Sequence, residues 1–207
     1  MSPRPNVEEQ RRRQILEAAC DAIAERGFAA VRIADIAVGA NTSTGTVHYY
    51  FDNKEDVLHQ ALRFAFEESI GRQVTELATC PTARAKLGRL IELNLPEKAE
   101  AVREWVVWME FWIEALHRPE MRPVNEELYG HWRKLVAEII SEGQEVGEFD
   151  AAANGADLAN LLIALVDGLA IQVLLHSKQM TVSEMRRLCL DFVDAHLGTR
   201  QLASSKI

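Results

Sequence analysis

The chain has 207 residues, of which 48% are hydrophobic and 26% charged, enough for one large domain or two small ones with a proper core. No apolar run reaches the roughly 18 residues of a membrane span, and acidic residues interrupt the stretch after the N-terminal arginines, unlike a secretory leader. Cys20, Cys80 and Cys189 lie far apart without CxxC spacing, which favours reduced thiols in a cytoplasmic protein.

The N-terminal residues predict an arm followed by a helix. Residues 1–7 hold two prolines and favour a mobile arm, in which Arg4 is either solvated or a phosphate contact. From Glu8 to Arg26 an apolar stripe at helical spacing predicts a helix that ends at Gly27. Arg11–Arg13 at its start are further candidates for phosphate contact.

The segment Ile33–Lys54, IADIAVGANTSTGTVHYYFDNK, predicts a helix-turn-helix. Its apolar residues up to Ala40 fall at helical spacing and end in the polar turn Asn41-Thr42-Ser43. Ser43 is placed to cap a short second helix, Thr44 to Tyr50. Two short helices across a tight turn are typical of DNA-reading proteins.

The second of these helices offers groups suited to DNA. Hydroxyl, imidazole and ammonium groups can contact base edges and phosphate oxygens, and a glycine allows close backbone approach. The candidate DNA-binding residues are Arg32, Ser43, Thr44, Gly45, Thr46, His48, Tyr49, Tyr50 and Lys54.

The motif Ser43-x-Gly45-Thr46-Val47-x-Tyr49-Tyr50-Phe51, followed by Asn53-Lys54-Glu55, resembles the DNA-binding signature of TetR-type repressors. The resemblance covers residues 8–60. Three positions depart from the family pattern. Asn41 replaces the usual turn glycine, and Asn tolerates a left-handed conformation. His48 stands where Tyr is frequent in the family. Arg32 stands where a small hydroxyl residue usually caps the next helix, so that cap is either exchanged for a phosphate contact or simply lost.

The net charge of −8 is unusual for a DNA-binding protein. Residues 1–72 carry 9 Lys and Arg against 11 Asp and Glu, and the remaining residues carry 14 against 20. The N-terminal part that is predicted to read DNA, residues 1–72 and called the reading head below, is therefore close to neutral, and the rest of the chain is acidic. We expect strong salt dependence of DNA binding and modest non-specific affinity.

The remaining chain predicts helices and no strand, so the fold class is all-α. Helices are expected over 54–77, from Thr82 to Leu95, over 102–117, over 124–146, over 156–176 and over 183–197. The predicted domains are residues 1–53, a three-helix helix-turn-helix domain, and 54–207, a ligand-binding and dimerisation domain that begins with the long helix 54–77.

The helix over 102–117 predicts an effector site. Three tryptophans occur within eight residues, next to acidic groups, and aromatic rings with carboxylates suit a cationic amine. Core packing for each tryptophan and a solvated face for the acids stay open as alternatives. The candidate ligand-binding residues are Trp105, Trp108, Met109, Trp112, Glu110, Glu114, His117, Tyr129 and Trp132.

The last two helices predict a homodimer surface, because a two-fold operator is matched by a two-fold protein. The alternative is that they only close the core of one chain. The candidate interface residues are Leu158, Leu162, Leu165, Leu169, Val173, Leu188 and Phe192. Gly168, inside an apolar helix, is expected to allow close helix approach.

The segments WVVWMEFWIEALHRP (105–119) and LIALVDGLAIQVLLHSK (162–178) resemble the regulatory domain of BetI-type repressors, TetR relatives that control choline and glycine betaine metabolism. The resemblance implies a repressor that binds double-stranded DNA as a homodimer and is released by a small-molecule effector, a choline-like cation or a polyamine. Sensing of drugs or other hydrophobic ligands is the alternative.

An enzyme is not expected, because no HExxH, GxSxG, P-loop or GxGxxG motif is present. Glu114 and His117 match one half of a di-iron Glu-x-x-His pattern, but no second pair exists. We therefore predict no cofactor and no metal site.

Overall fold

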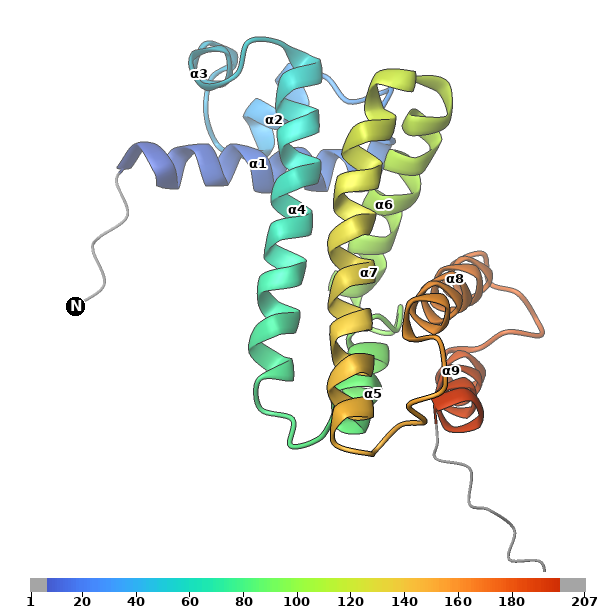
Figure 1. The fold of residues 1–207 in the computed structure, drawn as a ribbon. Helices are drawn as coiled ribbons and strands as arrows, with labels where there is room; N and C mark the ends of the chain where they lie inside the picture. The colour runs from blue at the N-terminus through green and yellow to red at the C-terminus, as the bar shows by residue number, and fades with distance from the viewer. Residues whose placement is uncertain (1–6, 198–207) are drawn as a thin grey trace, which may run out of the picture. The chain divides into compact units, whose positions relative to one another are not determined.

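The computed structural model describes residues 7–197, and these contain α-helices, one 3-10 helix and no β-strand (Figure 1). The all-α prediction is therefore confirmed. The expectations for Arg4 and for the rest of the terminal segments, 1–6 and 198–207, lie outside the described residues.

The helices match their predicted ranges closely. The largest difference is at α6, which begins three residues before the expected Val102. The elements are α1 Val7–Arg26, α2 Ile33–Gly39, α3 Thr44–Tyr50, α4 Lys54–Leu77, α5 Ala83–Leu93, α6 Ala99–His117, η1 Pro119–Met121, α7 Arg122–Glu145, α8 Gly155–Leu174 and α9 Val182–Leu197.

Capping residues explain several of these boundaries. The Thr82 hydroxyl accepts a hydrogen bond from the Ala85 amide at the start of α5, and Asn154 caps α8 through the Asp157 amide. Gly27 and Gly147 follow α1 and α7 with φ of 75° and 78°, a conformation that glycine adopts without strain. The helix ends are therefore set by local sequence.

The chain divides into two compact units. The first comprises residues up to Gly71 together with Val102–Leu128, and the second comprises Arg72–Ala101 together with residues from Tyr129 onward. The divisions fall within α4, α6 and α7. The domain boundary between residues 53 and 54 remains a prediction.

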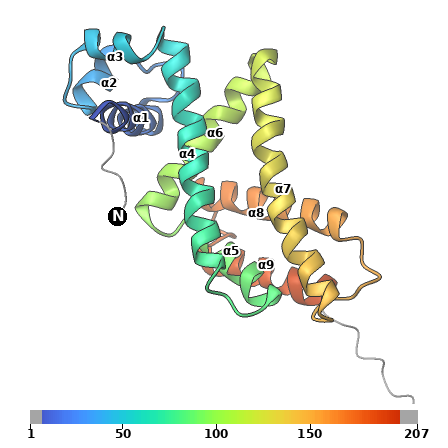
Figure 2. The same cartoon turned by 60° about the vertical axis from the view of Figure 1, so that its left-hand side comes forward.

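In the first unit, α1, α2 and α3 pack beside the N-terminal end of α4 (Figures 1 and 2). A Cβ at Gly39 would lie 3.1 Å from the Cβ of Ala18, so α1 and α2 approach closely. The core combines residues of the helix-turn-helix with residues of α4, α6 and α7. Its fully buried members include Ile15, Ile23, Ile36, Val47, Val57, Leu58, Ala61 and Phe111.

In the second unit, α8 packs against α9, and α5 also contacts α9. Figure 2 shows α8 and α9 lying side by side. Gly143 of α7 lies directly under the ring of Phe149, which a Cβ would overlap. The buried residues of these helices include Leu87, Ile140, Ala170, Met185 and Cys189.

Helix α8 is long and apolar enough to cross a membrane by length and composition, with a mean hydropathy of 1.7 over its most apolar window. A third of that window, 33%, is buried within the chain. Apolar helices that pack inside a protein pass the same test, so one such helix is weak evidence for a span.

Candidate DNA-binding and effector-binding sites

The turn between α2 and α3 has the geometry expected from its residues. Asn41 adopts φ 49°, the left-handed conformation predicted for it. The Ser43 hydroxyl accepts a hydrogen bond from the Thr46 amide at 3.0 Å and contacts the Thr46 hydroxyl at 2.9 Å. Ser43 and Thr46 therefore cap α3, which limits the DNA contacts that their hydroxyls can make.

Helix α3 presents most of its predicted DNA-binding side chains to solvent. Val47 is fully buried and anchors the helix, whereas Tyr49 is 74% exposed. The other exposed members of the set are Arg32, Ser43, Thr44, Gly45 and His48. An exposed helix of this length with donors and acceptors on its outer face suits the major groove.

Two members of the predicted set have structural roles in addition. Tyr50 is half-buried and packs against the core, with its ring 5.0 Å from that of Tyr49. Lys54 donates a hydrogen bond to the Ala29 carbonyl at 2.8 Å, so its ammonium ties α4 to the loop after α1. The prediction of a phosphate contact for Lys54 thus meets a competing interaction within the chain.

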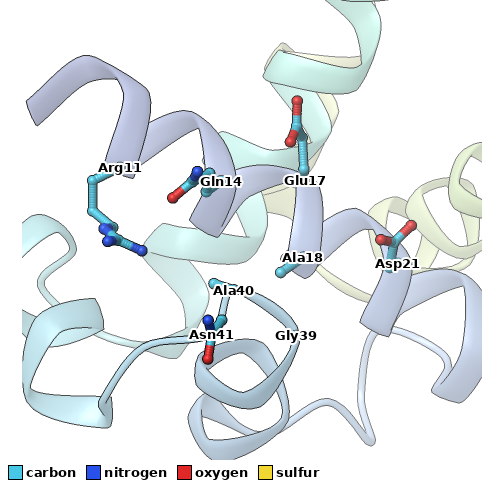
Figure 3. Close-up of a pocket in the computed structure, with 8 residues that line it drawn as sticks. All are labelled: Arg11, Gln14, Glu17, Ala18, Asp21, Gly39, Ala40 and Asn41. Atoms are coloured by element: carbon cyan, nitrogen blue, oxygen red, sulfur yellow. The ribbon is translucent and has the colours of Figure 1, made fainter. Parts of the chain in front are cut away.

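A polar pocket of about 450 Å³ lies between α1 and the turn that follows α2 (Figure 3). Arg11 and Asn41 line it at one end, and Glu17 and Asp21 also belong to its lining. Arg11 has no hydrogen bond or ion pair among residues 7–197. Among Arg11, Arg12 and Arg13, Arg11 is therefore the residue whose charge is available for a phosphate.

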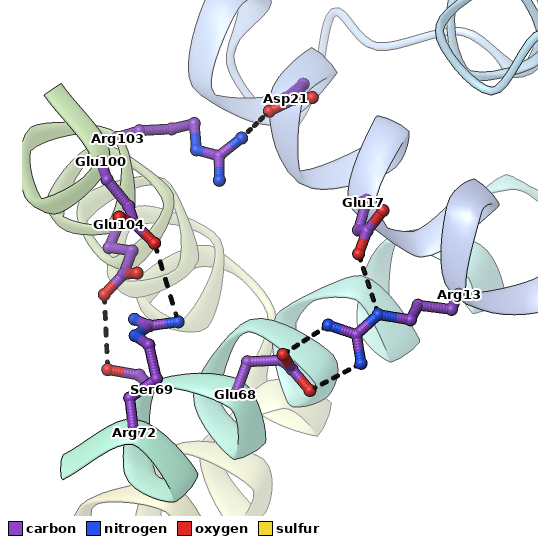
Figure 4. A network of polar contacts seen from close by, with 9 residues as sticks. All are labelled: Arg13, Glu17, Asp21, Glu68, Ser69, Arg72, Glu100, Arg103 and Glu104. Atoms are coloured by element: carbon purple, nitrogen blue, oxygen red, sulfur yellow. Dashed lines mark hydrogen bonds and ion pairs between the residues drawn. The ribbon is translucent and has the colours of Figure 1, made fainter. Parts of the chain in front are cut away.

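Arg12 and Arg13 are engaged within the first unit. Arg12 donates to the Gln60 amide oxygen and lies over the Phe51 ring. Arg13 bridges Glu17 at 2.9 Å and Glu68 at 2.6 Å (Figure 4). Both side chains therefore join α1 to α4, and the prediction of phosphate contacts from them is weakened.

On α6, burial does not follow the spacing of the tryptophans alone. Val107, Phe111 and Ala115 are buried in the first unit, whereas Leu116, four positions after Trp112 and therefore on the same side of the helix, is 74% exposed. Trp105 is buried, and Trp108, Met109 and Trp112 are half-buried. The sequence pattern identified an apolar face but not its centre.

The three tryptophans form one aromatic cluster in the first unit. The ring centroids of Trp105 and Trp112 are 6.4 Å apart, and those of Trp108 and Trp112 are 6.1 Å apart. Trp108 also packs edge-on against Phe66 and Phe111, each at 5.8 Å. The cluster joins α6 to α4, and the half-buried rings of Trp108 and Trp112 remain partly accessible to solvent.

The predicted ligand-binding acids Glu110 and Glu114 have partners within the first unit, and these compete with the predicted contact to an effector. Glu110 accepts a hydrogen bond from the Phe28 amide at 2.8 Å, because α6 runs beside the loop between α1 and α2. Glu114 forms an ion pair with Arg118 at 3.0 Å. His117 is exposed, and no contact connects it to Glu114 or to the rings.

In the second unit, the predicted residue Tyr129 donates a hydrogen bond to the Asp167 carboxylate. Burial raises the pKa of Asp167 to about 6, and the hydrogen bond from Tyr129 opposes this shift. Burial also raises the pKa of Tyr129, with the Asp167 charge acting in the same direction. Trp132 is half-buried. Sequence reasoning did not select Asp167, although a lone carboxylate within an apolar run was a visible signal.

The predicted dimer residues fall into two groups. Leu162 and Leu169 are 3% and 7% exposed within the single chain, so they belong to its own core and are not available to a partner. Leu158, Leu165, Val173, Leu188 and Phe192 are half-buried. The exposed apolar side chains of the segment are instead Leu161, at 53%, and Leu175, at 69%, and a Cβ at Gly168 would meet no atom within 4 Å.

The three cysteines are free thiols, and Cys20 and Cys189 are buried. Burial raises the pKa of Cys20 to about 12 and that of Cys189 to about 11, so neither is a ready thiolate. Among residues 7–197 no group of three His, Cys, Asp or Glu side chains is arranged to hold a metal ion.

The capped and exposed α3, carried by α1 and α2, defines a helix-turn-helix DNA-binding protein with a helical C-terminal part. Comparisons with known proteins agree. Residues 15–61 match the model of the bacterial regulatory proteins of the tetR family, and residues 83–198 match that of the C-terminal domain of BetI-type transcriptional repressors. The chain belongs to the TetR family and is a transcriptional repressor of the BetI type.

Individual relatives extend the likeness over nearly the whole chain. The transcriptional regulator BetI of Escherichia coli is 28% identical over 200 residues, covering 95% of this chain and 99% of its own. A transcriptional regulator from Saccharomonospora viridis, solved in complex with choline, is 40% identical with a TM-score of 0.85, covering 92% of this chain and 99% of the other. A TetR-family regulator from Rhodococcus sp. is 26% identical with a TM-score of 0.82, covering 91% and 99%.

Proposed function

We propose that this repressor binds a two-fold operator as a cytoplasmic homodimer and is released by a small organic cation of the choline type. It acts by binding alone, without a catalytic step. The observation that carries the proposal is the direct connection between the tryptophan-bearing helix α6 and the reading head, through Glu110 and the Phe28 amide.

The DNA contacts follow from exposure and charge. His48 and Tyr49 on the outer face of α3 are proposed to reach base edges and phosphates, with Arg32 at the entrance to α2 and Arg11 at the start of α1 neutralising phosphates. Because few cations are available on this head, each one is expected to contribute visibly to the salt dependence of binding.

The effector class is supported by the relatives and by the aromatic residues. A regulator 40% identical to this chain was solved with choline. Quaternary ammonium groups are attracted to the faces of tryptophan and tyrosine rings. Trp108 and Trp112 in the first unit, and Tyr129 and Trp132 in the second, are therefore separate candidates for contact with the ammonium group, and each is to be tested on its own.

The homodimer is supported by the unpartnered face of α8. Leu161 and Leu175 expose large apolar side chains, and the space around Gly168 is open within the chain. A glycine inside a helix costs about 1 kcal/mol relative to alanine. A second copy packing against this face would give that cost a structural reason.

The route to the reading head passes through the loop between α1 and α2. Phe28 is buried there and stacks on His59 of α4 with ring centroids 6.1 Å apart, while its amide donates to Glu110. The Ala29 carbonyl accepts from Lys54. We propose that effector binding displaces α6 and thereby moves this loop, so that the two heads of the dimer no longer match their half-sites.

A gel shift with DNA from upstream of the protein's own gene tests this function. We expect a specific shift that weakens with salt, disappears in Tyr49→Ala and is reversed by choline. Coupling of 1–3 kcal/mol corresponds to a change of about 5- to 150-fold in operator affinity. Tight choline binding without any change in operator affinity would contradict the proposed release. Release by apolar compounds but not by cations would instead identify a sensor of hydrophobic ligands.

A further inference from the structure

Asp167 and Tyr129 form a polar pair between two helices of the second unit. The Tyr129 hydroxyl of α7 donates to Oδ2 of Asp167 on α8. Apart from this bond, the Asp167 carboxylate has no hydrogen-bond partner and no ion pair among residues 7–197. The neighbouring residues on α8 are apolar or glycine. Oδ1 therefore remains open to a further partner.

A carboxylate that is partly removed from water without a positive partner is costly. The Arg133 guanidinium lies over the Tyr129 ring at 5.4 Å from its centroid, and no ion pair joins it to Asp167. The raised pKa of Asp167 expresses the same cost. A structural hydrogen bond between α7 and α8 needs no charge, and a neutral amide at position 167 would supply it at lower cost.

We propose that Asp167 is the negative counter-charge for the ammonium group of the effector, with Tyr129 holding the carboxylate in place. This inference rests on the proposed function, since it names the residue that distinguishes a cationic effector from a neutral one. An ammonium near the open Oδ1 would supply the partner that the chain itself does not, and the binding energy would include relief of the unpaired charge.

The test uses calorimetric titration with two ligands of nearly the same shape. Choline carries a quaternary nitrogen, and 3,3-dimethylbutan-1-ol has a carbon in its place. We expect wild-type protein to prefer choline, and Asp167→Asn to lose about 30-fold in choline affinity while retaining affinity for the neutral alcohol. The matched control is Asp157→Asn, the same change on an exposed position of α8, which is expected to leave both affinities unaltered.

Asp167→Leu provides a second variant of similar size, because an apolar residue in place of a part-buried charge is generally well tolerated. It too should bind the neutral alcohol and lose choline. Equal choline affinity in wild type and in both variants would overturn the assignment of Asp167 while leaving a choline-released repressor intact. Absence of choline binding to wild-type protein would overturn the proposed effector class, and this assignment with it.

Discussion

The Glu110 carboxylate on α6 accepts a hydrogen bond from the Phe28 amide, 82 positions earlier in the chain, at 2.8 Å. The carboxylate also lies against the residue before Phe28, since a Cβ at Gly27 would lie 3.0 Å from Oε2 of Glu110. Figure 4 shows that α1 is also bonded to α6 through Arg103 and Asp21 and to α4 through Arg13 and Glu68. The helix that carries the tryptophans is thus bonded to the reading head at two places.

Glu110→Ala is expected to separate effector binding from DNA release. The variant leaves the Phe28 amide without its acceptor, which should cost about 1–3 kcal/mol of folding stability. Choline affinity should change little, whereas the effect of choline on operator affinity should fall. Fluorescence anisotropy with labelled operator measures both, and Glu100→Gln on the same helix is the control. Unchanged coupling in Glu110→Ala would show that another route connects the sites.

Adjacent tyrosines of α3 should behave differently. Tyr49 is 74% exposed, so Tyr49→Ala is expected to reduce operator affinity more than 10-fold without changing the thermal midpoint. Tyr50 packs on the core, so Tyr50→Ala should lower the midpoint as well. Thermal unfolding and anisotropy distinguish the two. If Tyr49→Ala bound the operator normally, α3 would not be the reading helix.

Arg11 and Arg13 provide a matched pair for the phosphate contacts. Arg11→Ala should lower the slope of log operator affinity against log salt by about 2 for the dimer, because one counter-ion fewer is released at each of its two heads. Arg13→Ala removes the bridges to Glu17 and Glu68 and should mainly affect stability, by up to about 1 kcal/mol since the bridges are solvent-exposed. Equal salt slopes in wild type and Arg11→Ala would contradict the contact.

The raised pKa of Asp167 predicts how stability varies with pH. Its pKa rises from the ordinary 3.8 to about 6 on folding, so the folded state binds the proton more tightly than the unfolded state. This contribution is complete below about pH 4 and is lost as the pH rises through 6. The free energy of unfolding of wild type, relative to Asp167→Asn, should fall by up to about 3 kcal/mol between pH 4 and 7. Urea titrations across this range measure it, and parallel profiles would contradict it.

Leu161 and Leu162 separate the dimer surface from the core. Leu161 is 53% exposed, and Leu161→Asp is expected to yield a folded monomer in sedimentation experiments. Leu162 is 3% exposed, so Leu162→Ala should cost about 2–5 kcal/mol of stability and retain the dimer. A Leu161→Asp variant that remains dimeric would place the interface on another surface.

Local sequence determined what could be predicted about the fold. Helix ranges follow from apolar spacing, capping residues and glycines, and each of these acts within a few positions of the boundary it sets. Ser43, Asn41 and Thr82 were read correctly for this reason. The exposure of α3 also followed, because a short polar helix with one buried residue has few alternatives.

The roles of charged side chains depended on contacts between distant segments. Nothing near Glu110 indicates that its carboxylate reaches the Phe28 amide, and nothing near Arg13 indicates Glu68. Leu162 was predicted to lie on the outer face of α8, whereas the structure exposes Leu161 there, and this difference has a simpler cause. Neighbouring apolar residues on a helix differ by about 100° in direction, and both lie in a run where every position is apolar.

The shared core of the first unit limits how the reading head can be exchanged between regulators. Val57, Leu58 and Phe111 are fully buried together with Ile15 and Ile36, although they lie in α4 and α6. A cassette cut after residue 53 would leave these apolar side chains without their partners on both pieces. Recombination that grafts a new DNA specificity onto this chain would therefore have to preserve the facing side chains of α6, or bring them along, and hybrid regulators are expected to succeed only between close relatives.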